Sequence, residues 1–215
     1  MYKYVIFDLD GTLLNTLDDL GNAGNFALKE QGFPTHEIEK YKYFVGNGIP
    51  KLIERILPEE EKERSFKKTY DLFCSYYDEH KRDFTRPYEG IIELLKRLSE
   101  AGVRTAVVTN KADEFAGKLV YDIFGNLIER TYGSVESIPK KPDPYLVNKA
   151  ILDFGAEKKE VLYVGDSGVD METALNAGLD SCGVLWGFRD KKELLENGAK
   201  DVVTDTDELL CKILN

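Results

Sequence analysis

The first residues whose types and spacing could do chemistry are two acids near the amino terminus. Four successive β-favouring apolar residues, 4–7, lead directly into Asp8, Leu9 and Asp10. Residues i and i+2 of an extended segment point the same way, so the two carboxyl groups can face one small volume. Because like charges repel, this pair predicts a bound cation or a shared proton. The alternative is a strand followed by an ordinary hydrophilic turn.

Two later apolar segments also end in polar residues. Residues 103–108 lead into Thr109 and Asn110, and residues 161–164 lead into the polar segment 165–170. In an open parallel sheet, ligands bind beyond the carboxyl ends of the strands. Each of these residues alone has an ordinary structural explanation, and only their joint placement predicts a site. If the sheet is parallel, one edge gathers these candidates: Asp8, Asp10, Thr109, Asn110, Lys141, Asp166 and Asp170.

The residue types at this edge suit phosphoryl transfer assisted by a divalent cation. Carboxylate oxygens at this density favour Mg²⁺, with Asp8, Asp10, Asp166 and Asp170 as candidate ligands. Zinc would want His or Cys, which these motifs lack. With the Lys141 ammonium and a hydroxyl nearby, the site complements a phosphoryl group in transfer. Asp8 is the expected nucleophile, forming an aspartyl-phosphate, and Asp10 the acid that protonates the leaving oxygen and later activates water.

Alternating helix and strand patterns predict the elements that position these residues. The segment 140–144 is predicted to open a helix, with Pro142 near its first position. Alternation of this kind predicts an α/β fold with a doubly wound parallel sheet and right-handed crossovers. Strands are expected near 4–7, 103–108, 130–135, 161–164, 181–186 and 201–203. Helices are expected over 91–98, over 113–124 and through 171–175, the last ending at Gly178.

A separate helical insert is expected over residues 16–86, with 1–15 and 87–215 forming the α/β core. The insert is rich in Lys, Glu and Tyr, shows helical spacing and contains no convincing strand. A helix over 13–31 leads into it, although its two glycines weaken that prediction. A second helix is expected over about 60–81.

A glycine-bearing loop over 44–50 lies inside the insert and leads into a helix. Gly46 and Gly48 would let the backbone approach a substrate, and Asn47 could hydrogen-bond a small polar leaving group. Lys51 could pair with a substrate carboxylate. The alternative is an ordinary turn between helices, with Lys51 as a solvated lysine.

Composition limits the classes of partner. The chain has 215 residues and a net charge of -10, with 42% hydrophobic and 32% charged residues. Such an acidic surface argues against nucleic-acid binding. The apolar stretch before Asp8 is too short for a signal peptide or a membrane span, so we expect a cytoplasmic protein with no membrane partner. Cys74, Cys182 and Cys211 are widely spaced, which argues against a disulfide framework.

The motifs together resemble the haloacid dehalogenase superfamily. Residues 8–12 resemble its first motif, Thr109-Asn110 its second, Lys141-Pro142 its third and 165–170 its fourth, in the expected order along the whole chain. The resemblance implies a Rossmann-like core with the insert as a helical cap over the site. Dehalogenases and phosphonatases of this kind lack the second aspartate, which is present here as Asp10.

Within that superfamily the chain resembles phosphoglycolate phosphatases, because 18–20, 44–48 and 52–57 follow their cap pattern. Asn15 departs from the acid usual in relatives. The resemblance implies a Mg²⁺-dependent phosphomonoesterase acting on a small phosphate ester. Sugar phosphates, nucleoside monophosphates and pyrophosphate remain alternative substrates. A receiver-type signalling domain and a non-catalytic phospho-ligand binder are alternatives of another class. The oligomeric state is not predicted.

Overall fold

The structure is a computed structural model that describes residues 1–215. The chain divides into two compact units, Met1–Leu14 with Pro87–Asn215, and Asn15–Arg86. Two short strands, β2 (Leu14–Asn15) and β3 (Arg86–Pro87), form a two-stranded sheet. The chain passes from one unit to the other within these two strands. None of the helices combines the length and apolar character needed to cross a membrane.

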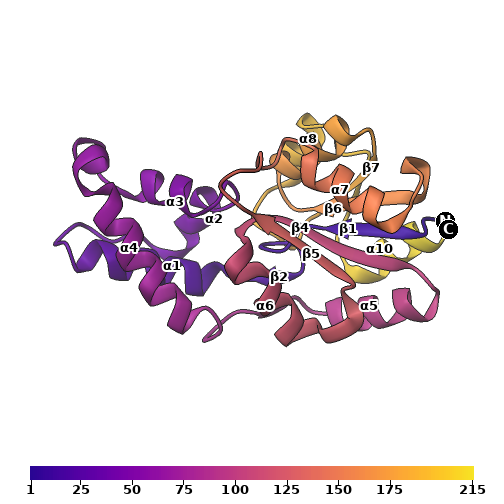
Figure 1. Cartoon of the computed structure of the whole chain (residues 1–215), viewed down its shortest axis with the longest axis horizontal. Coiled ribbons are helices and arrows are strands. Elements are labelled where there is room, and N and C mark those ends of the chain that lie inside the picture. Colours follow the sequence, from indigo (N-terminus) through magenta and orange to yellow (C-terminus); the bar gives the residue numbers. More distant parts are fainter. The chain divides into compact units, whose positions relative to one another are not determined.

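The first unit is built on a six-stranded sheet in the order β5-β4-β1-β6-β7-β8 (Figure 1). Every pairing in it is parallel. This confirms the predicted doubly wound α/β fold, because neighbours that are not consecutive in sequence require crossovers. The strands are β1 (Tyr4–Phe7), β4 (Arg104–Ala112), β5 (Arg130–Ser134), β6 (Val161–Gly165), β7 (Asp180–Val184) and β8 (Asp201–Val203).

Helices cover both faces of this sheet. Val5 and Phe7 of β1 face one cluster of buried side chains, which includes residues of α5, α6 and α10. Ile6 faces the opposite cluster, formed with α7 and α8. The alternation of one strand between two apolar layers explains why β1 reads as a continuous apolar run. The helices are α5 (Ile91–Glu100), α6 (Asp113–Phe124), α7 (Tyr145–Phe154), α8 (Gly168–Ala177), α9 (Lys191–Glu196) and α10 (Thr206–Leu214).

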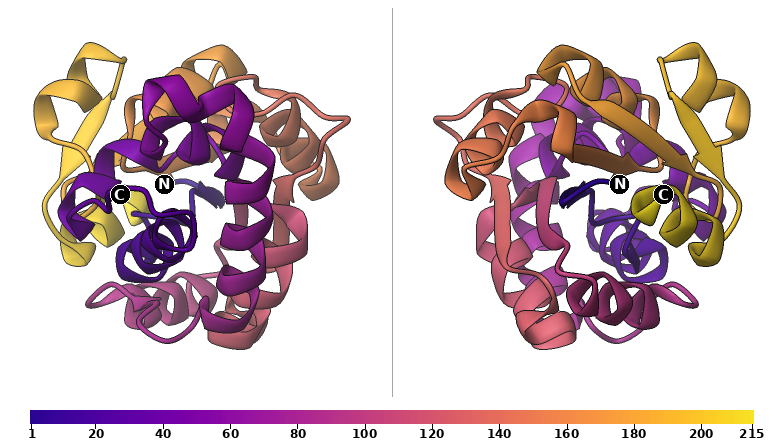
Figure 2. Two further views of the ribbon diagram at one scale, coloured as in Figure 1. Left: turned by 90° about the vertical axis from the view of Figure 1, so that its left-hand side faces the viewer. Right: turned by 90° about the vertical axis from the view of Figure 1, so that its right-hand side faces the viewer.

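The two chain ends lie side by side in this unit, as both views in Figure 2 show. The Tyr2 amide donates to the Ile213 carbonyl over 2.9 Å. Helices α9 and α10 were not among the predicted elements. Each begins at an aspartate, Asp190 or Asp205, whose side chain accepts a backbone N–H three residues on. These N-caps are the local signal that marks both starts.

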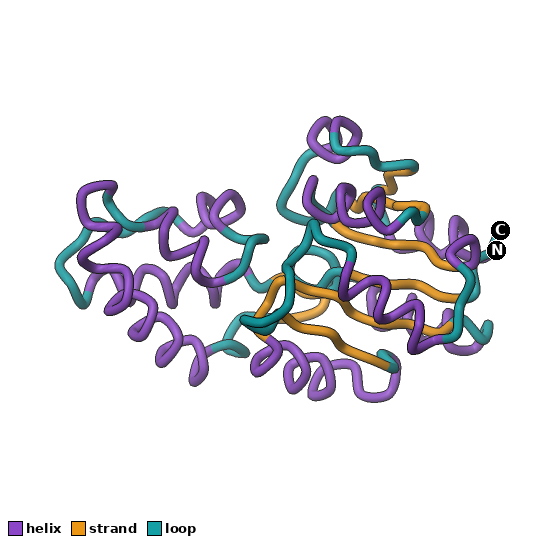
Figure 3. The backbone as a smooth tube through the Cα atoms, turned by 45° about the horizontal axis from the view of Figure 1, so that its top comes forward, coloured by secondary structure: helices purple, strands orange, loops and turns teal.

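The second unit contains helices and loops only, apart from Asn15 of β2 and Arg86 of β3 at its two ends (Figure 3). The glycines of α1 allow close packing, because a Cβ on Gly24 would lie 2.4 Å from Tyr41 Oη. Gly21 lies against Ile38 and Tyr41 in the same way. Its elements are α1 (Leu17–Lys29), η1 (Ile38–Lys40), α2 (Tyr41–Phe44), α3 (Ile49–Ile56), η2 (Glu59–Glu61) and α4 (Lys62–His80).

Two predicted helix starts are wrong. The helix expected from residue 13 begins at Leu17, because Leu14 belongs to β2 and the Asn15 side chain accepts the Leu17 N–H over 3.2 Å. The helix expected to open around Pro142 begins at Tyr145. The segment before it is held as a loop, in which the Pro142 carbonyl accepts a hydrogen bond from Asn176 over 3.0 Å.

Candidate active site

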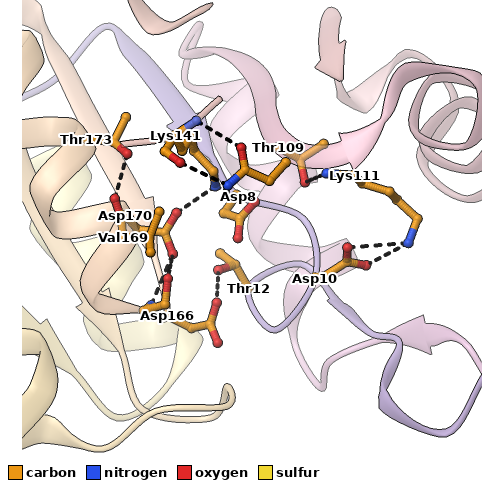
Figure 4. Close-up of polar contacts among 12 residues, drawn as sticks. Asp8, Asp10, Thr12, Thr109, Lys111, Lys141, Asp166, Val169, Asp170 and Thr173 are labelled. Atoms are coloured by element: carbon orange, nitrogen blue, oxygen red, sulfur yellow. Dashed lines mark hydrogen bonds and ion pairs between the residues drawn. The ribbon is translucent and has the colours of Figure 1, made fainter. Parts of the chain in front are cut away.

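The site lies in the first unit, beyond the carboxyl ends of β1, β4 and β6 (Figure 4). Asp8 follows β1 directly, and its amide still donates to the Val164 carbonyl of β6 over 2.9 Å. This bond continues the sheet pairing one residue past the strand. The Asp8 side chain is therefore held at the sheet edge, where it is 10% exposed.

Lys141 bridges two of the carboxylates. Its Nζ lies 2.7 Å from Asp8 Oδ1 and 2.7 Å from Asp170 Oδ1, and its side chain is 2% exposed. The contact of Lys141 with Asp8 is an ion pair and not a hydrogen bond, because Asp8 Oδ1 has no hydrogen-bond partner. Burial by itself would lower the pKa of Lys141, but the carboxylates of Asp170 and Asp8 outweigh it and raise that pKa well above its usual value. The lysine therefore remains charged.

Asp170 is fully engaged by the protein. Its Oδ1 accepts from Lys141 and, over 3.2 Å, from the Tyr163 hydroxyl. Its Oδ2 accepts from the amide and hydroxyl of Ser167 over 3.1 and 2.6 Å, which forms the capping box of α8. Both oxygens are committed, so Asp170 is built to orient Lys141.

Asp166 is held between two loops. Its Oδ1 accepts from the Thr12 hydroxyl over 3.1 Å, and its Oδ2 accepts from the Phe188 amide over 2.8 Å. The approach is close enough to require glycine on both sides: a Cβ on Gly11 would lie 2.3 Å from Asp166 Oδ2, and one on Gly187 2.3 Å from its Cβ. The segment around Gly187 thus fixes this acid.

The acidic cluster fits a divalent cation. One carboxylate oxygen from each of Asp8, Asp166 and Asp170 lies within 4.8 Å of the other two, with the Asp170 oxygens already hydrogen-bonded to the protein. Three carboxylates against the single Lys141 ammonium leave two negative charges. Burial and the neighbouring Asp170 raise the pKa of Asp8 to about 7, with Lys141 opposing. Burial, Asp170 and Asp8 likewise raise the pKa of Asp166 well above its usual range. A cation bound here would relieve this cost.

Asp10 lies outside that cluster. Its carboxylate contacts the ammonium of Lys111, which lies 3.1 Å from Oδ1 and 3.3 Å from Oδ2. Thr109 and Lys111 both belong to the last part of β4, which extends beyond the predicted strand end. The Thr109 hydroxyl accepts from the Lys111 amide over 3.2 Å, and Thr109 is buried. Asn110 instead hydrogen-bonds to the main chain of Lys141.

The candidate residues of the second unit form their own contacts. Lys51 pairs with Glu54 one turn along α3, and its side chain is 52% exposed. Asn47 Oδ1 accepts from Arg55 Nη2 over 2.8 Å, and Arg55 also donates to the Phe44 carbonyl over 2.9 Å. Gly46 has a φ of 114°, a conformation that favours glycine. Arg55 of α3 therefore holds this loop through its contacts with Phe44 and Asn47.

Sequence reasoning missed several contacting side chains. Tyr163 was assigned only to an apolar strand, although a buried tyrosine hydroxyl needs a polar partner, and that requirement is a usable signal. Ser167 and Asp170 have the spacing of a capping box, which is another. For Lys111, Arg55 and Phe188 no local pattern indicates the contact, because their partners are distant in sequence or depend on loop conformation.

Comparison with known proteins found relatives that match this chain along most of its length. A family model described as haloacid dehalogenase-like hydrolase matches residues 5–184. A relative from Haemophilus influenzae named phosphoglycolate phosphatase is 35% identical over 223 residues, covering 97% of each chain. One of the same name from Thiobacillus denitrificans is 33% identical over 204 residues, covering 90% of this chain and 88% of the relative.

A solved structure shows the same fold over the whole chain. It is a provisionally named phosphoglycolate phosphatase from Lactobacillus delbrueckii subsp. bulgaricus, with a TM-score of 0.94 and 31% sequence identity. The alignment covers 100% of this chain and 99% of that one. The likeness therefore includes both units.

Proposed function

The chain belongs to the haloacid dehalogenase-like hydrolases and is a phosphatase, and we propose that it hydrolyses a small phosphorylated metabolite through an aspartyl-phosphate on Asp8. The observation that carries the proposal is the Lys141 ammonium, 2.7 Å from both Asp8 and Asp170 beside a third buried acid. This arrangement combines a nucleophile, a fixed positive charge and a place for a cation. The relatives named phosphoglycolate phosphatase make phosphoglycolate the first candidate substrate.

The residues support a Mg²⁺ ion as the cofactor. Asp8 and Asp166 would hold it through their carboxylates, and Asp10 through its main-chain carbonyl, because its carboxylate contacts Lys111. Asp170 would contribute by orienting Lys141 and by its negative charge. When bound, the ion would neutralise charge on the phosphoryl group during transfer.

The reaction would proceed in two steps. An oxygen of the Asp8 carboxylate attacks phosphorus, the bond from phosphorus to the leaving oxygen breaks, and Asp10 donates a proton to that oxygen. A water molecule then attacks the aspartyl-phosphate while Asp10 accepts its proton, which releases inorganic phosphate and restores Asp8. The Thr109 hydroxyl and the Lys141 ammonium would bind the phosphoryl oxygens, and Asn110 would hold Lys141 in place.

The insert would select the leaving group. We propose that the loop of Gly46 and Asn47 contacts the non-phosphate end of the substrate and that Lys51 pairs with a substrate carboxylate. Lys51 would exchange Glu54 for that carboxylate on binding. Sugar phosphates, nucleoside monophosphates and pyrophosphate are the alternative substrates on this scaffold. The phosphatases among the relatives favour turnover over a receiver-type or purely binding role.

A turnover screen tests this function. Phosphoglycolate, a hexose phosphate, a nucleoside monophosphate and pyrophosphate are each incubated with the protein in Mg²⁺ or in EDTA, and released phosphate is measured. We expect Mg²⁺-dependent release, largest from phosphoglycolate, and none from Asp8→Asn. Phosphate release that persists in EDTA would contradict the proposed Mg²⁺ cofactor. Faster release from another ester would show that phosphoglycolate is not the preferred substrate.

A further inference from the structure

Lys111 is the side chain that hydrogen-bonds to the Asp10 carboxylate (Figure 4). The ammonium contacts both carboxylate oxygens, at 3.1 and 3.3 Å. The Lys111 side chain is 3% exposed and that of Asp10 12% exposed. Exposed ion pairs hold their partners weakly, because water screens them and the side chains remain mobile. This pair is shielded from water, so Lys111 restrains the direction in which the carboxylate points.

The main chain around Asp10 is fixed without fixing its side chain. The Gly11 amide donates to the Leu14 carbonyl over 2.9 Å, and the Leu14 amide donates to the Leu9 carbonyl over 2.9 Å. These bonds close a tight turn after β1 and set the position of the Asp10 Cα. They leave the rotation about its side-chain bonds open. Lys111 is therefore the group that determines where the acid points.

Lys111 is itself anchored beside the reacting groups. It lies near the end of β4, the strand that pairs with β1, and its amide donates to the Thr109 hydroxyl over 3.2 Å. One short segment thus carries both the proposed phosphoryl-binding hydroxyl and the contact to the acid.

We propose that Lys111 is a positioning residue for proton transfer by Asp10, an inference that rests on the acid–base role of Asp10 in the proposed function. A protonated carboxyl group keeps one oxygen free to accept a hydrogen bond. Lys111 can therefore hold one oxygen while the other gives its proton to the leaving oxygen, and hold it again when Asp10 takes a proton from water. Removal of Lys111 leaves the acid present but misdirected.

The test compares leaving groups. p-Nitrophenolate leaves without protonation, whereas the glycolate of phosphoglycolate needs a proton. For Lys111→Met we expect kcat/KM, which reports the steps through departure of the leaving group, to fall about 30-fold on phosphoglycolate and less than about 3-fold on p-nitrophenyl phosphate, because displacement of a catalytic group by 1 Å can cost on the order of 100-fold. Lys111→Arg, which keeps a cation, should recover most of the loss. Lys118→Met, at an exposed lysine of α6, is the control and should match the wild type.

A cycle with Asp10→Asn identifies the route of the effect. Lys111→Met should slow the Asp10→Asn enzyme no further, because both changes remove the same proton transfer. Equal losses on both esters, an effect on KM alone, or full additivity with Asp10→Asn would overturn the inference. If circular dichroism shows that Lys111→Met is unfolded, Lys111→Gln compared with Lys111→Arg applies the same criteria. An Asp10→Asn enzyme whose kcat/KM falls equally on both esters would instead contradict the acid role of Asp10.

Discussion

Asn110 holds the main chain of Lys141 on both sides of the residue. The Lys141 amide donates to Asn110 Oδ1 over 2.9 Å, and Asn110 Nδ2 donates to the Lys141 carbonyl over 3.2 Å. The side-chain amide of Asn110, near the end of β4, thus binds the loop that contains Lys141, 31 residues further along the chain. Because the loop is fixed there, the ammonium can reach Asp8 and Asp170 together.

Asn110→Ala should remove both bonds and release this loop. We expect kcat/KM on p-nitrophenyl phosphate to fall on the order of 100-fold, because Lys141 loses its placement. The free energy of unfolding should fall by about 1–3 kcal/mol, since buried partners are left unsatisfied. Asn176→Ala is the matched control, because Asn176 donates to the adjacent Pro142 carbonyl from an exposed position. Equal, small effects of the two substitutions would show that Asn110 does not position Lys141.

Gly187→Ala should damage the site through contact alone. The new Cβ would lie 2.3 Å from the Cβ of Asp166 and 2.4 Å from the Gly11 carbonyl oxygen, so both loops must move. We expect a loss of about 1–3 kcal/mol in the free energy of unfolding, together with most of the activity. Gly117→Ala in α6 meets nothing within 4 Å and should be neutral or slightly stabilising. Wild-type stability and turnover in Gly187→Ala would refute the close packing.

The metal-free protein should lose stability as the pH rises from about 4 to about 7, the window between the ordinary and folded pKa of Asp8. The folded state binds more protons there than the unfolded state, so ionisation of Asp8 favours unfolding. In EDTA at pH 8, Asp8→Asn should therefore be more stable than the wild type, by about 1–3 kcal/mol. At pH 4 this advantage should be absent. Urea unfolding at both pH values measures it.

Asp207→Asn is the control for this pH effect, because its side chain is 90% exposed. It should match the wild type at both pH values. Mg²⁺ should remove the advantage of Asp8→Asn at pH 8 by stabilising the wild type. A wild-type protein that is more stable than Asp8→Asn in EDTA at pH 8 would contradict the cost of burying this carboxylate.

Lys51→Ala tests the proposed recognition of a carboxylate. We expect kcat/KM for phosphoglycolate to fall about tenfold, the loss of one charge-assisted hydrogen bond. The phosphate ester of a neutral alcohol should change less than about twofold, because it makes no such contact. Lys67→Ala, at an 87% exposed lysine of α4, is the control. Equal losses on the two esters would leave Lys51 as a surface residue.

The site edge could be predicted because its parts obey one rule. Asp8, Thr109 and Asp166 each follow or end an apolar strand, and parallel strands bring such positions to the same edge. The rule requires only the strand pattern, which is strong for β1 and β6 because both are buried on two faces. Three segments that are distant along the chain can therefore be assigned to one edge from the sequence alone.

The contacts among the side chains at this edge of the sheet could not be predicted in the same way. The helix expected around Pro142 starts at Tyr145, because tertiary hydrogen bonds to Lys141 and Pro142 outweigh the local preference of proline for a helix start. The pairing of Asp10 with Lys111 depends on how β4 continues past Val108, where its register against β5 shifts. Strand irregularities of this kind leave no periodic signal.

The most direct test of the account is to trap the phosphoryl group on the enzyme. Asp10→Asn is mixed with p-nitrophenyl phosphate and Mg²⁺ and quenched in acid within one turnover, and the tryptic peptide of residues 4–29 is sequenced by mass spectrometry. Because this variant lacks the base that activates water, the intermediate should accumulate, and we predict one phosphoryl group located on Asp8. A phosphoryl group on another residue, or turnover with none on the enzyme, would contradict nucleophilic catalysis by Asp8.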